Sequence, residues 1–97
     1  MDLGVSLKIV LSNVARKDLD RCPDHIVRKY EYWVDMLQSV GLRESRKFKG
    51  FHDEPLQGSR RGQRSVRLSK SYRIIYRELD GDRFEIIEIL EVNKHEY

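Results

Sequence analysis

The sequence predicts an α+β fold, in which two N-terminal helices pack on one face of a small, mainly antiparallel sheet in the order β-α-α-β-β-β. Three patterns support this prediction. Apolar residues alternate with polar ones over residues 5–11, recur at helical spacing over residues 26–40, and alternate again in segments between residues 64 and 92. Because 97 residues can build only one compact core, we expect a single domain spanning residues 1–97.

The first strand and the first helix are predicted from the N-terminal residues. Alternation over residues 5–11 indicates a strand with one buried face. Ser12 or Asn13 supplies the N-cap of a short helix, since either side chain can accept a hydrogen bond from a backbone N–H of the first turn. This helix should end before Cys22, because Pro23 disfavours a helical conformation in the residue that precedes it.

A longer second helix is predicted from Pro23 to Gly41. Proline suits the first turn of a helix, and glycine is a common stop signal at its end. We interpret Tyr30 and Trp33 as core residues, because aromatic side chains at helical spacing usually pack inside a protein rather than stack on bases. The apolar stripe of this helix comprises Ile26, Val27, Tyr30, Trp33, Val34, Leu37 and Val40.

A long connection and three antiparallel strands are predicted for the C-terminal half. Residues 42–62 hold three glycines and a proline and are expected to form an irregular, basic loop. Loops of this length in a small domain often carry functional residues. The strands are expected at residues 64–68, 72–79 and 84–92, and they leave one face of the sheet open.

The last two strands are expected to form a tight hairpin. Asp80-Gly81 is typical of a two-residue type I′ turn, because both positions of that turn need a positive φ. An ion pair with Glu88 across this hairpin is the structural alternative to a functional role for Arg73. The predicted register pairs Glu78 with Arg83, Ile75 with Ile86, and Arg73 with Glu88.

The distribution of charge is more informative than the total. A net charge of +3 and a pI near 9.1 would suit many proteins that never bind nucleic acid. Basic residues are nevertheless concentrated between Arg43 and Arg77, which predicts contact with a polyanion. The candidate residues for contact with this polyanion are Lys47, Lys49, Arg60, Arg61, Arg64 and Lys70.

No pattern predicts a metal, a cofactor or a membrane segment. The histidines, His25, His52 and His95, are too scattered for a metal-ligand motif. Cys22 has no partner for an internal disulfide. No apolar stretch approaches the roughly 20 residues that span a bilayer, and residues 1–11 lack the features of a secretory signal. We therefore expect a cytoplasmic protein without a cofactor or a membrane partner.

The strands, the loop and the C-terminal tail hold the candidate functional groups. Arg67 and Arg73 lie on predicted strands, which are rigid mounts, and a guanidinium offers a planar fork of donors that matches phosphate oxygens. His95 and Tyr97 follow the last strand and would emerge beside these arginines if that strand runs to Val92. The loop adds His52, Asp53 and Glu54.

Short motifs from the loop, the strands and the tail together resemble a known family. These motifs are Glu54-Pro55-Leu56, Gly58, Arg67, Tyr72-Arg73-Ile74-Ile75-Tyr76 and Lys94-His95-Glu96-Tyr97. The set resembles the RelE/ParE toxin superfamily, and within it the RelE, YoeB and HigB-like ribonuclease branches. The resemblance covers nearly the whole chain, because the predicted order of elements matches as well.

The resemblance implies a toxin of a type II toxin-antitoxin system that a cognate antitoxin protein holds in check. Its implied activity is metal-independent endoribonucleolytic cleavage of mRNA, which inhibits translation; many relatives cut mRNA only in the A site of the ribosome. No cofactor is implied, since positioned acid-base groups and electrostatic stabilisation can each contribute a factor of about one hundred or more.

The implied active site comprises Glu54, Arg67, Arg73, His95 and Tyr97. The resemblance also makes RNA the expected polyanion, so the predicted RNA-contacting residues are Lys47, Lys49, Arg60, Arg61, Arg64 and Lys70. Glu54 would take the proton of the ribose 2′-OH, and His95 would protonate the leaving oxygen. Arg73, helped by Arg67, would stabilise the extra negative charge on the phosphate.

The sequence departs from the YoeB-like pattern at two positions. Asp53 stands where that branch has a proline, and its carboxylate could repel Glu54 or share its work. Glu96 separates His95 from Tyr97, which that branch has as a pair.

Two other functions stay open. A ParE-like toxin of the same fold would poison DNA gyrase without cutting RNA, although His95 and Glu54 argue against that branch. A non-enzymatic RNA-binding module would bind RNA in a salt-sensitive manner and yield no product.

Overall fold

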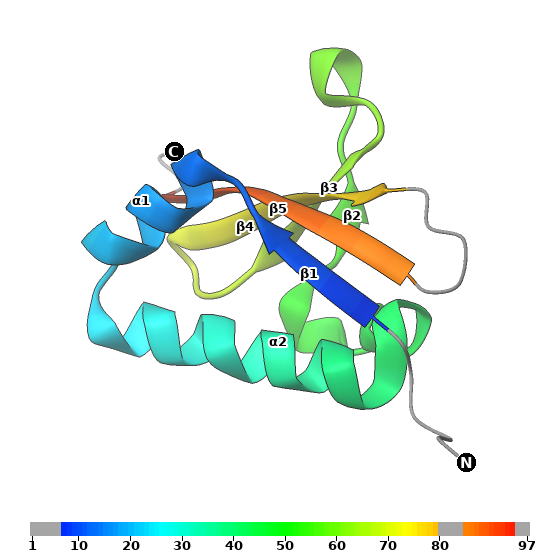
Figure 1. Cartoon of the computed structure of the whole chain (residues 1–97), viewed down its shortest axis with the longest axis horizontal. Helices are drawn as coiled ribbons and strands as arrows, with labels where there is room; N and C mark the ends of the chain where they lie inside the picture. Colours follow the sequence, from blue (N-terminus) through cyan, green and yellow to red (C-terminus); the bar gives the residue numbers. More distant parts are fainter. Residues whose placement is uncertain (1–6, 80–84, 95–97) are drawn as a thin grey trace.

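The computed structural model describes residues 7–79 and 85–94 as a five-stranded sheet with two helices on one face (Figure 1). The strand order is β1-β5-β4-β3-β2, with β1 parallel to β5 and all other neighbours antiparallel. The predicted α+β fold is confirmed. None of the helices in the described ranges is long and apolar enough to cross a membrane. The elements are β1 (Leu7–Leu11), α1 (Asn13–Arg21), α2 (Asp24–Ser45), η1 (Lys49–Phe51), β2 (Glu54–Pro55), η2 (Gly58–Arg60), β3 (Gln63–Arg67), β4 (Tyr72–Leu79) and β5 (Glu85–Lys94), where η marks a 3₁₀ helix.

The first helix begins and ends where the sequence predicts. Ser12 is its N-cap, because Ser12 Oγ accepts a hydrogen bond from the backbone N–H of Ala15 at 3.0 Å. The same hydroxyl donates to the carbonyl oxygen of Leu90 at 2.8 Å. The helix ends at Arg21, just before Cys22. One serine therefore caps α1 and ties it to β5.

Gly41, the predicted end of the second helix, is instead a break within it. Its φ of 84° and ψ of 168° are not helical, yet the helix resumes and continues to Ser45. The added turn buries Leu42, and the hydroxyl of Ser45 donates to the carbonyl oxygen of Leu42 at 2.7 Å. Apolar burial thus favours a turn that the glycine signal alone does not predict. This turn also brings Arg46 toward the sheet.

The core lies between α2 and the sheet, around Trp33. This side chain is 1% exposed, and its ring centroid lies 5.6 Å from that of the fully buried Tyr76. The interpretation of Trp33 as a core residue is confirmed, and Tyr30 packs partly buried against the same cluster. Val40 of the predicted stripe is exposed, whereas Met36, one turn earlier, is buried.

The predicted irregular connection contains an additional edge strand. Glu54 and Pro55 form β2 and pair with Ser65 and Arg64 of β3. Proline conceals such a strand from sequence analysis, but an edge strand tolerates it because one side of the strand needs no ladder donor. Phe51, just before β2, is buried and fixes this segment to the core.

The hairpin of β4 and β5 has a different register from the predicted one. Leu79 faces Ile86, so six residues (80–85) separate the paired positions and the predicted two-residue turn is wrong. Residues 80–84, Arg83 among them, lie outside the described residues. In the observed register Glu78 faces Ile87, Ile75 faces Glu91, and Arg73 faces Asn93.

A bulge in β5 explains why strict alternation does not hold there. Leu90 has no partner on β4, because the pairing shifts by one residue at that point. Without the shift, Glu91 would follow Ile89 onto the face that the helices cover. The bulge places Val92 on that face instead, where it is 4% exposed.

Candidate active site

The register of the sheet brings three of the predicted site residues onto its open face. Arg67 of β3 lies directly opposite Arg73 of β4, and Ser65 lies opposite Glu54 of β2. Directly opposed side chains share a face, and so do residues two apart on one strand. Val66, between the two β3 residues, is buried among the core residues on the other face. Glu54, Arg67 and Arg73 therefore project away from the helices.

A polar pocket forms where these side chains meet. It contains both predicted arginines and the predicted carboxylate, together with Lys70 from the predicted RNA-contacting set. Its walls are almost entirely polar atoms, as expected for a site that binds a charged group rather than an apolar ligand. The lining residues are His52, Glu54, Ser65, Arg67, Ser69, Lys70, Tyr72 and Arg73.

The two arginines of the pocket form no ion pair with a carboxylate of the described ranges. The structural alternative for Arg73, an ion pair with Glu88, does not form, because Arg77 faces Glu88 and binds it with Nη2 2.8 Å from Oε1. Like charges that face each other across two strands repel. Arg67 and Arg73 therefore form a positively charged pair that an anion between them would neutralise.

The turn between β3 and β4 is held by Ser69, which sequence analysis did not single out. Ser69 Oγ accepts hydrogen bonds from the backbone N–H groups of Ser71 and Tyr72, each at 3.1 Å. The backbone N–H of Leu68 donates to the carbonyl oxygen of Tyr72 at 2.8 Å. These bonds fix the turn that carries Lys70 at the edge of the pocket. Serine in a short polar segment between strands is a recognisable turn signal.

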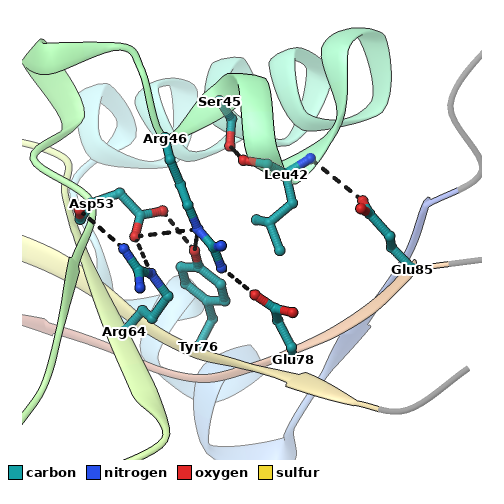
Figure 2. A network of polar contacts seen from close by, with 8 residues as sticks. All are labelled: Leu42, Ser45, Arg46, Asp53, Arg64, Tyr76, Glu78 and Glu85. Carbon is teal, nitrogen blue, oxygen red and sulfur yellow. Dashed lines mark hydrogen bonds and ion pairs between the residues drawn. The ribbon is translucent and has the colours of Figure 1, made fainter.

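Asp53, between two pocket residues, is turned to the opposite face of the sheet (Figure 2). Its side chain is 1% exposed. Oδ1 accepts a hydrogen bond from Arg64 Nε and Oδ2 accepts one from Tyr76 Oη, both at 2.6 Å. Arg46 Nε lies 4.0 Å from Oδ1, and the Arg46 side chain also contacts the carboxylate of Glu78. We call Asp53, Arg64, Tyr76, Arg46 and Glu78 the buried polar cluster. Because Asp53 is engaged there, it does not line the pocket beside Glu54.

The buried polar cluster perturbs the ionisation of two of its members. Burial, and then the hydrogen bond and charge of Asp53, raise the pKa of Tyr76 well above the ordinary value for tyrosine. Burial alone would lower the pKa of Arg46, but hydrogen bonds to Glu78 and Tyr76 outweigh it and raise that pKa. Tyr76 is therefore a neutral donor and Arg46 a cation when they meet Asp53.

We expect alkaline pH to destabilise the protein through Tyr76. In the unfolded chain this phenol ionises near its ordinary pKa of 10.0, whereas the folded state holds the pKa higher. The contribution of Tyr76 to the free energy of unfolding is thus complete below about pH 10 and is lost as pH rises toward the folded pKa. Urea unfolding at pH 8 and pH 11 should show a larger loss of stability for the wild-type protein than for Tyr76→Phe. An equal loss in the two proteins would contradict this assignment.

The other predicted basic residues lie outside the pocket. Hydrogen bonds from Asn93 and Arg60 keep the pKa of Glu91 low, so this carboxylate stays ionised and holds Arg60 in an ion pair. The segment that carries η2 rises from the sheet on the side away from α2 (Figure 1). The predicted RNA-contacting residues outside the pocket are Lys47, Lys49, Arg60, Arg61 and Arg64.

The C-terminal part of the predicted site lies outside the described residues. His95 and Tyr97 belong to this part. The last described residue, Lys94, pairs with Tyr72 of β4, which is next to Arg73. Within the described ranges, no group of three or more His, Cys, Asp or Glu side chains is arranged to hold a metal ion.

Comparisons with known proteins relate the sequence and the fold to toxins. The family described as the ParE toxin of type II toxin-antitoxin system, parDE, matches residues 9–96. No curated protein matches the chain.

Several solved structures share the fold over most of the chain. The YoeB/ParE toxin from Agrobacterium tumefaciens has a TM-score of 0.67 and 20% identity, covering 92% of this chain and 99% of that one. The E. coli DinJ-YafQ toxin-antitoxin complex has a TM-score of 0.69 and 22% identity, covering 94% of each chain. The archaeal RelE-RelB complex from Pyrococcus horikoshii has a TM-score of 0.67 and 22% identity, covering 93% of this chain and 96% of that one. At these identities the likeness shows a shared fold.

Proposed function

The chain belongs to the ParE toxin family of type II toxin-antitoxin systems, and we propose that it is an endoribonuclease toxin that cleaves messenger RNA. The observation that carries this proposal is the polar pocket in which Glu54 meets the positively charged pair Arg67 and Arg73. A carboxylate beside two cations without carboxylate partners in the described ranges suits proton transfer at a bound phosphate.

The proposed reaction is transesterification within the RNA backbone. The ribose 2′-oxygen forms a bond to the adjacent phosphorus, and the bond from that phosphorus to the 5′-oxygen breaks. Glu54 takes the proton of the 2′-OH, while Arg73 and Arg67 bind the phosphate oxygens and stabilise their added charge. An acid donates a proton to the leaving 5′-oxygen. The products are a 2′,3′-cyclic phosphate and a 5′-OH. The family resemblance assigns the acid to His95 and includes Tyr97 in the site, and this assignment rests on the sequence alone.

The proposal also implies partners. Lys70 at the edge of the pocket would contact the RNA nearest the reacting phosphate, and the basic residues around η2 would contact it further along. We infer that the ribosome presents the mRNA and that a cognate antitoxin blocks the toxin. The fold that this chain shares with proteins solved in the DinJ-YafQ and RelE-RelB complexes supports an antitoxin partner. Ribosome-bound mRNA as substrate places the action of the protein in the cytoplasm.

A translation reaction with mapped mRNA ends tests the proposed activity. Purified toxin is added to a reconstituted translation system and, separately, to the same mRNA without ribosomes. We expect new 5′-OH ends in the first reaction, and their suppression when the antitoxin is added first. Intact mRNA in both reactions would overturn the proposal. Salt-sensitive RNA binding without cleavage would identify an RNA-binding module instead.

Gyrase poisoning is the second candidate, and the match to the ParE toxin family favours it. This function needs no acid-base group at a phosphate, so it leaves the pocket of Glu54, Arg67 and Arg73 without a role. Incubation with gyrase, ATP and supercoiled plasmid distinguishes the two. Linear DNA without mRNA cleavage would support gyrase poisoning, and mRNA cleavage without linear DNA would support the ribonuclease.

A further inference from the structure

The imidazole of His52 lies at the pocket and has no role in the reaction proposed above. His52 is exposed and lines the pocket with Glu54, Arg67 and Arg73. Histidine changes its protonation state between pH 5 and 8 more readily than any other side chain, so it can donate a proton near neutral pH. A histidine at the same polar pocket as the carboxylate and the arginine pair is therefore a candidate acid.

The backbone at His52 is held in an uncommon conformation. Its φ of 46° and ψ of 53° make it the one non-glycine residue with positive φ in the described ranges. Such a conformation is unfavourable for a non-glycine residue and persists only where the surroundings enforce it. The backbone N–H of His52 donates to the carbonyl oxygen of Lys49 at 3.1 Å, which closes η1 just before the chain enters β2.

Asp53, which follows His52 directly, is anchored in the buried polar cluster. Its carboxylate is fixed on the helix side of the sheet by Arg64 and Tyr76, each at 2.6 Å. Successive side chains of an extended segment point to opposite faces. Glu54, the first residue of β2, is therefore directed to the face where the pocket lies, and His52, whose backbone is left-handed rather than extended, lines the same pocket from the end of η1.

We propose that His52 is a catalytic residue of this pocket that protonates the leaving 5′-oxygen, and that Asp53 is the positioning residue that directs His52 and Glu54 toward the same phosphate. The inference rests on the proposed ribonuclease function and deepens it. One proton passes from the 2′-OH to Glu54 and another from the His52 imidazolium to the departing oxygen, so charge and atoms balance. The charged groups that line the pocket with His52 are Glu54 from β2, Arg67 from β3, Lys70 from the following turn and Arg73 from β4.

A substrate that needs no acid tests this assignment. In an RNA whose reacting linkage carries sulfur in place of the bridging 5′-oxygen, the thiolate leaves without protonation. His52→Asn is the variant of choice, because asparagine tolerates positive φ better than most residues. We expect His52→Asn to cleave ordinary RNA about 100-fold more slowly than wild type, and the sulfur-substituted RNA within about 3-fold of wild type. Glu54→Gln should be slow on both substrates, because loss of the base is not rescued by a better leaving group.

Two controls make the outcome decisive. His25→Asn changes an exposed histidine of α2 that does not line the pocket, and should cleave both RNAs at the wild-type rate. Circular dichroism of every variant verifies folding. The inference is overturned if His52→Asn cuts ordinary RNA at the wild-type rate, or if it is equally slow on both substrates. The proposed ribonuclease function stands in either case. If His95→Asn alone is rescued by sulfur, the acid is His95 and the inference is wrong. A wild-type protein that cuts neither RNA overturns the proposed function and this inference with it.

Discussion

Replacing Arg73 by alanine is expected to lower mRNA cleavage by about 100-fold or more and to abolish growth arrest in cells, without weakening the fold. The guanidinium is held on β4 opposite Arg67 and at the same pocket as Glu54. Its proposed role is to bind the phosphate oxygens as they gain charge, an interaction that alanine cannot replace. Single-turnover cleavage, with the variant in excess over mRNA, measures the loss directly.

Stability provides an independent readout for the same variant. Arg73 and Arg67 face each other and form no ion pair with a carboxylate of the described ranges, so removing one charge relieves repulsion. Arg73→Ala should therefore unfold at a urea concentration equal to or higher than that of the wild-type protein. If Arg73 had a structural role instead, Arg73→Ala would lower both the stability and the cleavage rate.

Arg77→Ala is the matched control. Arg77 lies on the same strand and the same face as Arg73, but it is bound to Glu88 and does not line the pocket. We expect its cleavage rate to stay within about 2-fold of wild type and its stability to fall by less than about 1 kcal/mol, as for an exposed ion pair. Equal loss of cleavage in the Arg73 and Arg77 variants would show that general positive charge, rather than this pocket, accounts for activity.

Local signals predicted most of the fold because they act over a few residues. Ser12 caps α1 through Ala15, three residues away, and Pro23 sets the end of that helix. The prediction of the hairpin failed because its register does not depend on local signals. Asp80-Gly81 is favourable for a tight turn, but the buried face of β5 and its bulge set the register, and these depend on contacts across the whole sheet.

The candidate site was predictable only in part. Family resemblance pointed to Glu54, Arg67 and Arg73, and the register of β2, β3 and β4 brings all three to one pocket. His52 shares this pocket, although a lone histidine in a polar loop carries no signal of its own. The buried polar cluster could not be predicted from the sequence, because its members come from four separate segments and its four charged residues resemble ordinary surface charges.

Asp53→Ala is expected to lower the free energy of unfolding by about 3 kcal/mol. The change removes the carboxylate that accepts hydrogen bonds from Arg64 and Tyr76. The buried O–H of Tyr76 and the partly exposed guanidinium of Arg64 then lose that partner. The partial exposure of Arg64 keeps the loss at the lower end of the range for a broken buried ion pair. Urea unfolding monitored by the fluorescence of Trp33, which packs against Tyr76, measures the change at the cluster itself.

Two further variants test whether the stability depends on the buried charge of Asp53 or on any charge in the cluster. Glu78, at its outer end, has a side chain that is 55% exposed, so Glu78→Ala should cost less than about 1 kcal/mol. Asp53→Asn retains the shape and one acceptor oxygen but loses the charge. Its loss of stability should lie between those of Asp53→Ala and Glu78→Ala. Because Asp53 directs His52 and Glu54 to the pocket, Asp53→Asn should also slow cleavage under conditions where the variant remains folded. If Asp53→Ala and Glu78→Ala lower the stability equally little, the cluster is not an anchor, and the pairing of β2 with β3 and the burial of Phe51 hold the segment instead.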